Sequence, residues 1–129
     1  MPTPTEIVQT AYAAFGRGDL PAMLALFSED IDWQFTADRK APYTGRMSGK
    51  AQMVEWFTAV AQNDDIHAFE PRQFLAGPDH VTVLGWERTT VRGKGTFESE
   101  WVHIWQLADG KITRFWGMLD SEAAATARG

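Results

Sequence analysis

The segment over residues 100–120, EWVHIWQLADGKITRFWGMLD, constrains the fold more than any other part of the chain. Two runs of alternating apolar residues flank Asp109-Gly110, and an Asp-Gly pair in that setting is the strongest short-range signal for a β-hairpin. Because side chains alternate between the two faces of a strand, Trp101, His103 and Trp105 are predicted to share one face. The hairpin thus predicts an aromatic wall that carries one titratable imidazole.

Helical periodicity dominates the first half of the chain. Apolar residues spaced three and four apart predict an amphipathic helix over residues 5–15, which the following glycines end. Asp19 is predicted to cap a second, shorter helix, LPAMLALF. A third helix is predicted over about residues 50–62. Between these helices, IDWQF at residues 31–35 predicts a short strand, and residues 36–49 are expected to form an exposed loop.

From His67 onward the apolar residues alternate with a period of two. Four strands, separated by short GPD, RGKG and DG turns, are predicted over residues 67–76, 80–91, 96–107 and 111–119. Short connections of this kind indicate an antiparallel meander. Asp120 either caps a terminal helix built on SEAAATA or lines the rim of a pocket.

This order of elements predicts the fold class. Helices followed by a curved antiparallel sheet indicate a single α+β domain over residues 1–129. We expect a cone-shaped barrel, in which a strongly curved, mostly antiparallel sheet wraps around three N-terminal helices and is followed by a short C-terminal helix. Such a sheet leaves a cavity, which is the natural site for a small apolar ligand.

Composition excludes several classes of function. The chain has no cysteine, so disulfides, thiol nucleophiles and thiolate metal sites are excluded. Its net charge of -5 comes with no basic block, which argues against nucleic acid or an anionic membrane as a partner. No secretory signal and no apolar run of about 20 residues is present, so a cytoplasmic location is expected. The histidines show no metal-ligand spacing and the glycines no phosphate-binding pattern, so neither a metal nor a cofactor is expected.

Several phrases of the sequence carry a family resemblance. They are AYAAFGRGDLPAMLALFSEDIDW, YTGRMSGKAQMVEWF, FEPRQFLAGPDHVTVLG and WVHIWQLADGKITRFWGMLD, and together they cover almost the whole chain. In order and spacing they resemble the SnoaL-like branch of the nuclear transport factor 2-like superfamily. The resemblance implies a conical barrel that is open at one end and often dimerises through the outer face of its sheet. Isomerases, cyclases, epoxide hydrolases and non-catalytic modules share that fold.

The catalytic groups of these relatives are matched only in part. Ketosteroid isomerases resemble the chain in architecture and use a tyrosine, a carboxylate base and a protonated aspartate. The resemblance places that tyrosine one position from Tyr12, the base at Phe35 and the aspartate at His103. SnoaL-type polyketide cyclases use a histidine, which His103 matches, and an aspartate, whose position is Gly117 here. Limonene-type epoxide hydrolases also place a carboxylate at that last position, so the chain keeps the histidine without the carboxylate.

His103 is the candidate catalytic residue, as a general base or a hydrogen-bond donor, with Tyr12 or Tyr43 as helpers. Burial would keep its imidazole neutral. Further residues are predicted to face the same pocket and bind the substrate: Trp33, Phe35, Trp86, Trp101, Phe115, Leu119 and Arg88. Together they favour a cofactor-independent isomerase, cyclase or hydrolase that acts on a small apolar cyclic or carbonyl compound. Two alternatives stay open: a non-catalytic ligand-binding protein, and a dimeric interaction module whose cavity is packed.

The opposite face of the predicted hairpin is also apolar. Val102, Ile104, Trp116 and Met118 fall on that face by strand parity. Apolar patches of this size rarely stay exposed. The sequence therefore predicts a two-fold homodimer through the outer face of the sheet.

Overall fold

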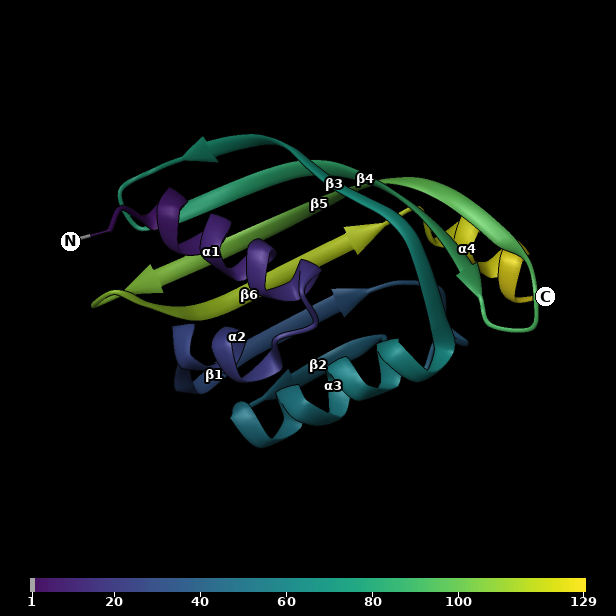
Figure 1. Ribbon diagram of the computed structural model, residues 1–129, viewed down its shortest axis with the longest axis horizontal. Helices are drawn as coiled ribbons and strands as arrows, with labels where there is room; N and C mark the ends of the chain where they lie inside the picture. The colour runs from purple at the N-terminus through teal and green to yellow at the C-terminus, as the bar shows by residue number, and fades with distance from the viewer. Residues whose placement is uncertain (1) are drawn as a thin grey trace.

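The computed structural model describes residues 2–129, which form four helices and one six-stranded sheet (Figure 1). In chain order the elements are α1 (Pro4–Gly16), α2 (Leu20–Leu26), β1 (Phe27–Thr36), β2 (Gly45–Ser48), α3 (Lys50–Asn63), β3 (Asp64–Ala76), β4 (His80–Val91), β5 (Thr96–Ala108), β6 (Lys111–Leu119) and α4 (Ser121–Arg128). The α+β fold class predicted from the sequence is confirmed. The three N-terminal helices lie on one side of the curved sheet, and α4 lies at the end where β3, β4 and β5 bend (Figure 1).

The β5–β6 hairpin forms as predicted. Asp109 has a φ of 52° and Gly110 a φ of 74°, so both turn positions are left-handed. This is the geometry that an Asp-Gly pair supplies at low cost. Across the ladder, Trp101 pairs with Leu119 and His103 with Gly117. The hairpin therefore places the imidazole in the middle of the sheet.

Both predicted aspartate caps are present. The Asp19 carboxylate accepts a hydrogen bond from the backbone N–H of Ala22 at 3.1 Å, which begins α2. The Asp120 carboxylate accepts one from the backbone N–H of Ala123 at 3.0 Å, which begins α4. Each cap satisfies a helix N–H that has no intrahelical partner. Of the two alternatives for Asp120, the structure shows the cap.

The strand order is β2-β1-β6-β5-β4-β3. All neighbouring strands are antiparallel except β1 and β6, which pair in parallel. The sheet curls strongly but does not close within residues 2–129, because β2 and β3 form its two edges. The β3–β4 ladder shifts register twice, between Ile66 and Ala68 and between Pro71 and Gln73. The predicted cone is therefore an open, curled sheet and not a closed ring of strands.

The prediction of an exposed loop over residues 36–49 was wrong. Gly45–Ser48 form the edge strand β2, which pairs with β1. Four of the residues before it are buried, among them Asp38 and Tyr43, which are each 3% exposed, whereas Arg39, Lys40 and Pro42 are exposed. The segment is covered because Arg128 of α4 packs against it and pairs with Asp38. The proline and glycine residues of this segment identified its turns, but they gave no indication that α4 packs over it.

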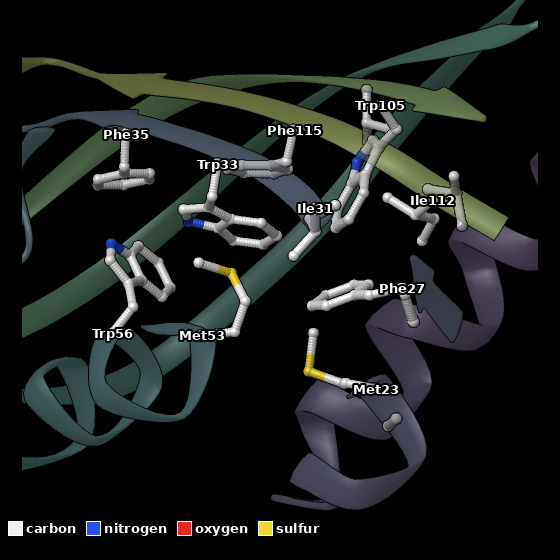
Figure 2. Close-up of a cluster of buried hydrophobic side chains, with 14 of the residues drawn as sticks. Met23, Phe27, Ile31, Trp33, Phe35, Met53, Trp56, Trp105, Ile112 and Phe115 are labelled. Carbon is white, nitrogen blue, oxygen red and sulfur yellow. The ribbon is translucent and has the colours of Figure 1, made fainter. Parts of the chain in front are cut away.

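The core lies between the inner face of the sheet and the helices. Figure 2 shows Trp33, Phe35 and Phe115 projecting from their strands towards Met53 and Trp56 of α3. The rings of Trp33 and Phe115 stack with centroids 3.9 Å apart. Large aromatic side chains thus pack the two layers together.

The outer face of the sheet is partly apolar, as predicted. Trp116 is 38% exposed, and the guanidinium of Arg114 lies 5.6 Å from its ring centroid. Val102, Ile104 and Met118 are half-buried on the same face. The structure describes one chain, so the homodimer through this face stays a prediction. No helix within residues 2–129 combines the length and the apolar character needed to cross a membrane.

Candidate active site

A hydrogen-bonded chain of three side chains holds His103 in place. The hydroxyl oxygen of Tyr12, on α1, lies 2.7 Å from Nδ1 of His103. The indole Nε1–H of Trp105 donates to the same hydroxyl oxygen at 3.0 Å. The structure therefore brings together the two residues that the sequence singled out as His103 and its helper Tyr12. Tyr43, the other candidate helper, lies elsewhere in the cavity wall.

This chain assigns the tautomer of His103. Because an indole N–H can only donate, the Tyr12 oxygen is the acceptor for Trp105. Nδ1 of His103 is the acceptor that the described residues offer to the Tyr12 hydroxyl proton. The imidazole proton then lies on Nε2, which no residue within 2–129 engages. Nε2–H is a hydrogen-bond donor available to a ligand.

Aromatic rings fix the orientation of the imidazole. Trp101 stacks on His103 with ring centroids 4.0 Å apart, and Phe69 also stacks on Trp101, at 4.8 Å. Gly85 makes this arrangement possible, since a Cβ there would lie 2.2 Å from the Trp101 ring. Burial lowers the pKa of His103 from 6.5 to about 3, so the ring is neutral at physiological pH.

His103 lines an apolar cavity of about 70 Å³ between the sheet and the helices. A larger vestibule of about 510 Å³ lies outside it, between the α1–α2 turn, the end of α3 and the start of β3. The two spaces share a set of lining residues, which marks the neck between them: Phe15, Met23, Phe57, Val60, Asp64 and Ile66. The cavity therefore lies next to the surface vestibule, beside the N-terminal end of β3.

Two carboxyl groups line the cavity, and sequence reasoning missed both. Glu87 of β4 is 7% exposed, and its Oε2 accepts a hydrogen bond from the Thr89 hydroxyl at 2.6 Å. Burial, together with the nearby charge of Asp64, raises the pKa of Glu87 to about 7. Asp64, the first residue of β3, also has a raised pKa because of its burial. A carboxyl that titrates near neutral pH in an apolar site is suited to acid–base chemistry.

A buried network supports Asp64 from behind. The Tyr43 hydroxyl donates to Oδ2 of Asp64 at 2.5 Å, and Nη2 of Arg128 donates to the Tyr43 hydroxyl oxygen at 3.2 Å. Nε of Arg128 in turn pairs with Asp38 at 2.9 Å, and both side chains are almost completely buried. Helix α4 thus helps to position a carboxyl of the cavity through two intervening side chains.

Six of the nine predicted site residues line the cavity: Tyr12, Trp33, Phe35, His103, Phe115 and Leu119. Trp101 stacks behind His103 and does not line the cavity.

The placement of Trp86 and Arg88 on the inner face of the sheet was wrong. Both lie on the outer face of β4, where the Arg72 guanidinium packs 5.2 Å from the centroid of the Trp86 ring and Arg88 is exposed. Glu87, between them, faces inward. The sequence did hold a signal for the correct inward face of β4. Val81 and Val83 are completely buried, and the alternation of side chains along a strand places Glu87 on the same face as these two valines.

Gly117, the position of the cyclase aspartate, has no room for a side chain. A Cβ at this residue would lie 2.6 Å from the Phe115 ring and 2.9 Å from the Phe35 ring. Aromatic packing thus replaces the carboxylate that the family resemblance places there. Within residues 2–129, no group of three His, Asp or Glu side chains is arranged to hold a metal ion.

We expect His103 and Glu87 to change the free energy of unfolding with pH in opposite directions. The folded chain binds fewer protons at His103 between pH 3 and 6.5, so His103 costs stability as the pH falls through that window. The folded chain binds more protons at Glu87 between pH 4.5 and 7, so Glu87 costs stability as the pH rises through that window. Each slope is at most about 1.4 kcal/mol per pH unit.

The two slopes nearly cancel in the native chain, and single variants separate them. In urea unfolding between pH 7 and pH 4.5, His103→Gln should gain stability relative to the native chain on acidification, and Glu87→Gln should lose it. Parallel curves for the native chain and both variants would show that neither group titrates as its burial implies.

The chain is similar in sequence and in fold to several known proteins. A sequence model of the SnoaL-like domain matches residues 8–115. The solved structure of an NTF2-like protein from Burkholderia thailandensis is 30% identical, with a TM-score of 0.90, and the match covers 100% of this chain and 99% of that one. An NTF2-like protein from Burkholderia xenovorans is 30% identical, with a TM-score of 0.88 and coverage of 98% and 95%. TerC, co-crystallised with polyporic acid, is 26% identical, with a TM-score of 0.84 and coverage of 96% of each chain. No curated protein matches the sequence.

Proposed function

The chain belongs to the SnoaL-like domain family, and from that premise we propose that it is an acid–base enzyme acting on a small apolar ring compound that carries a carbonyl group. One observation carries the proposal: a neutral imidazole donor and a carboxyl with a pKa of about 7 line the same apolar cavity. TerC, a structural relative, was co-crystallised with polyporic acid, which supports a small organic compound as the kind of ligand.

The two groups have separate tasks in this proposal. Nε2–H of His103 donates to the carbonyl oxygen, and the Glu87 carboxylate takes a proton from the carbon next to the carbonyl. The electron pair of that C–H bond forms a carbon–carbon double bond, and the carbonyl π pair moves to the oxygen, where His103 stabilises the charge. In a β,γ-unsaturated ketone, the proton returns from Glu87 to the γ carbon, the double bond moves into conjugation and the electron pair on oxygen re-forms the carbonyl. This isomerisation needs no oxidant and no second reactant.

Glu87 pairs across the ladder with Ser99, four residues before His103 on β5, which corresponds to about 13 Å along the strand. Because a carbonyl oxygen and the carbon next to the carbonyl lie close together in any ketone, the proposal requires that the two side chains reach towards each other within the cavity that both line.

Hydrogen–deuterium exchange tests the proposal without knowledge of the product. Cyclic ketones and enones are incubated with the protein in D2O, and NMR follows exchange at the carbons next to the carbonyl. We expect Glu87→Gln to slow the catalysed exchange about 10²-fold or more, because general base catalysis contributes on the order of 10²–10⁴-fold. His103→Ala should slow it at least tenfold, since it removes the donor to the enolate oxygen.

Glu98→Gln is the matched control. Glu98 lies on β5 beside the partner of Glu87 but is exposed on the outer face. The Glu98→Gln variant removes one carboxyl group, as Glu87→Gln does, and it should leave the exchange rate unchanged. Equal rates for the native chain, Glu87→Gln and His103→Ala would remove both residues from the mechanism.

A second function, the binding of a small molecule without catalysis, is favoured by the aromatic packing around Gly117, where the cyclase carboxylate would lie. The same experiment separates the two functions. A ketone that binds the native chain but shows no exchange above the buffer rate would establish binding alone.

A further inference from the structure

We propose that the compound bound in this cavity carries a cationic ammonium group, held between the carboxyls of Asp64 and Glu87 and the surrounding aromatic rings. The inference rests on the proposed function, because it assigns a charge to the ligand of the same cavity. It goes further in that neither the family nor the carbonyl chemistry requires a cationic ligand.

The groups of the cavity wall that can carry a charge are acidic, apart from the neutral His103. Two carboxyl groups line the cavity, and no lysine or arginine of the described chain does. Two cations act on Asp64 from a distance, and each already has a carboxylate partner: Arg128 pairs with Asp38 at 2.9 Å and Arg92 with Asp65 at 2.8 Å. His103 is neutral. A bound cation would therefore supply the counter-charge that the fold itself does not provide.

Both carboxyls have an oxygen without a hydrogen-bond partner among residues 2–129. Oδ1 of Asp64 is buried and has no hydrogen-bond partner among residues 2–129. Glu87 is 7% exposed and lines the cavity, and only its Oε2 is engaged, by Thr89. Unpaired buried carboxylates are costly, and an ammonium group in the cavity would offset that cost for both.

The walls near the neck are aromatic. Trp56 packs edge-on against Phe57 at 4.9 Å, against Phe35 at 5.2 Å and against Tyr43 at 6.0 Å between ring centroids. All four rings line the cavity that Asp64 enters. Because the arrangement is edge-to-face, it presents ring faces as well as edges to the space between them. Faces of tryptophan, tyrosine and phenylalanine attract alkylammonium groups.

Asp64 lies at the neck between the cavity of about 70 Å³ and the vestibule of about 510 Å³. An ammonium group beside it would leave the part of the cavity that His103 lines to the carbonyl end of the ligand. Asp19 and Asp65 line that vestibule, although each already pairs with a surface arginine.

A matched pair of ligands isolates the charge. Choline and 3,3-dimethylbutan-1-ol have the same shape, but a quaternary nitrogen in the first replaces a carbon in the second. Calorimetric titration at pH 7.5 should show that choline binds at least tenfold tighter than the alcohol. Glu87→Gln should reduce that preference to less than threefold, and Glu98→Gln, on the outer face, should leave it intact.

Proton release gives a second readout. The charged and titratable groups around Glu87 are Asp64 on β3, His103 on β5 and, behind Tyr43, the pair formed by Arg128 and Asp38. A cation beside Glu87 favours its ionised form, so choline binding at pH 7 should release up to about half a proton per site, given a pKa of about 7. Titrations in two buffers with different ionisation enthalpies measure this number, and Glu87→Gln should abolish the release.

The outcomes separate this inference from the proposed function. Equal affinities for choline and the alcohol, or no binding of choline at millimolar concentration, would overturn the ammonium site. Exchange catalysis on neutral ketones would then still support the proposed function. Tight choline binding with no exchange on any ketone would support the ammonium site and leave the protein a binding protein.

Discussion

Arg128→Ala is expected to lower the free energy of unfolding by about 3–5 kcal/mol, because it leaves a buried carboxylate without its partner. Asp38 is 3% exposed, and Nε of Arg128 lies within hydrogen-bond distance of both of its carboxylate oxygens, at 3.2 and 2.9 Å. The variant also removes the donor to Tyr43, whose hydroxyl supports Asp64 in the cavity. Urea unfolding at pH 7 measures the loss, and the slope with urea should stay unchanged.

Two further variants separate the buried pair from charge in general. Arg17→Ala removes an exposed pair with Asp19, in which the arginine side chain is 57% exposed, and should cost at most about 1 kcal/mol. Replacing both partners, as Arg128→Met with Asp38→Leu, should restore most of the stability, since apolar residues often substitute well for a buried ion pair. A loss below about 1 kcal/mol for Arg128→Ala would mean that water reaches Asp38.

Gly117→Asp, which grafts the cyclase carboxylate into its family position, is expected to destabilise the protein by more than about 3 kcal/mol and to give no aldol or epoxide chemistry. Overpacking costs about 1–3 kcal/mol, and a buried unpaired carboxylate adds to that cost. The rings of Phe35 and Phe115 occupy the space that the new side chain needs. Thermal unfolding and an aldol assay on the same sample measure both effects.

Further variants separate the two causes of this destabilisation, the volume of the new side chain and its charge. Gly117→Ala should show the overpacking alone, whereas Gly16→Ala, where a Cβ would meet nothing within 4 Å, should cost little. Combining Gly117→Asp with Phe35→Ala opens space beside the carboxylate and should recover part of the stability. A gain of aldol or epoxide chemistry in that pair would indicate a decayed active site. A stable Gly117→Asp single variant would show that the Phe35 ring moves readily.

The elements with strong local signals were predictable. The Asp-Gly turn, the two aspartate caps and the strands β4 and β6 lie where periodicity and capping residues placed them. The parallel pairing of β1 with β6 had no local signal, because it joins segments about 80 residues apart along the chain. The burial of Asp38 and Tyr43 likewise involves Arg128, which lies at the far end of the sequence.

The site was predicted in part, for similar reasons. Tyr12 and His103 were placed in one pocket through the family resemblance, and they meet at 2.7 Å. Glu87 was missed because Leu84 and Trp86 are large and apolar, which favoured the wrong parity for β4. Gly85, between them, faces inward because the ring of Trp101 covers it. The contact of Gly85 with Trp101 becomes evident only when β4 and β5 are packed together. The inward face of β4 therefore could not be identified from the sequence of that strand alone.

The irregular edge strand β3 has a consequence for behaviour at high concentration. β3 is 13 residues long and borders the open sheet, so a regular strand there would be a template onto which another extended chain could add. Its two register shifts interrupt the even spacing of hydrogen-bonding groups, and Pro71 has no N–H to offer. The other edge, β2, is four residues long. Both borders therefore resist fibre growth by strand addition.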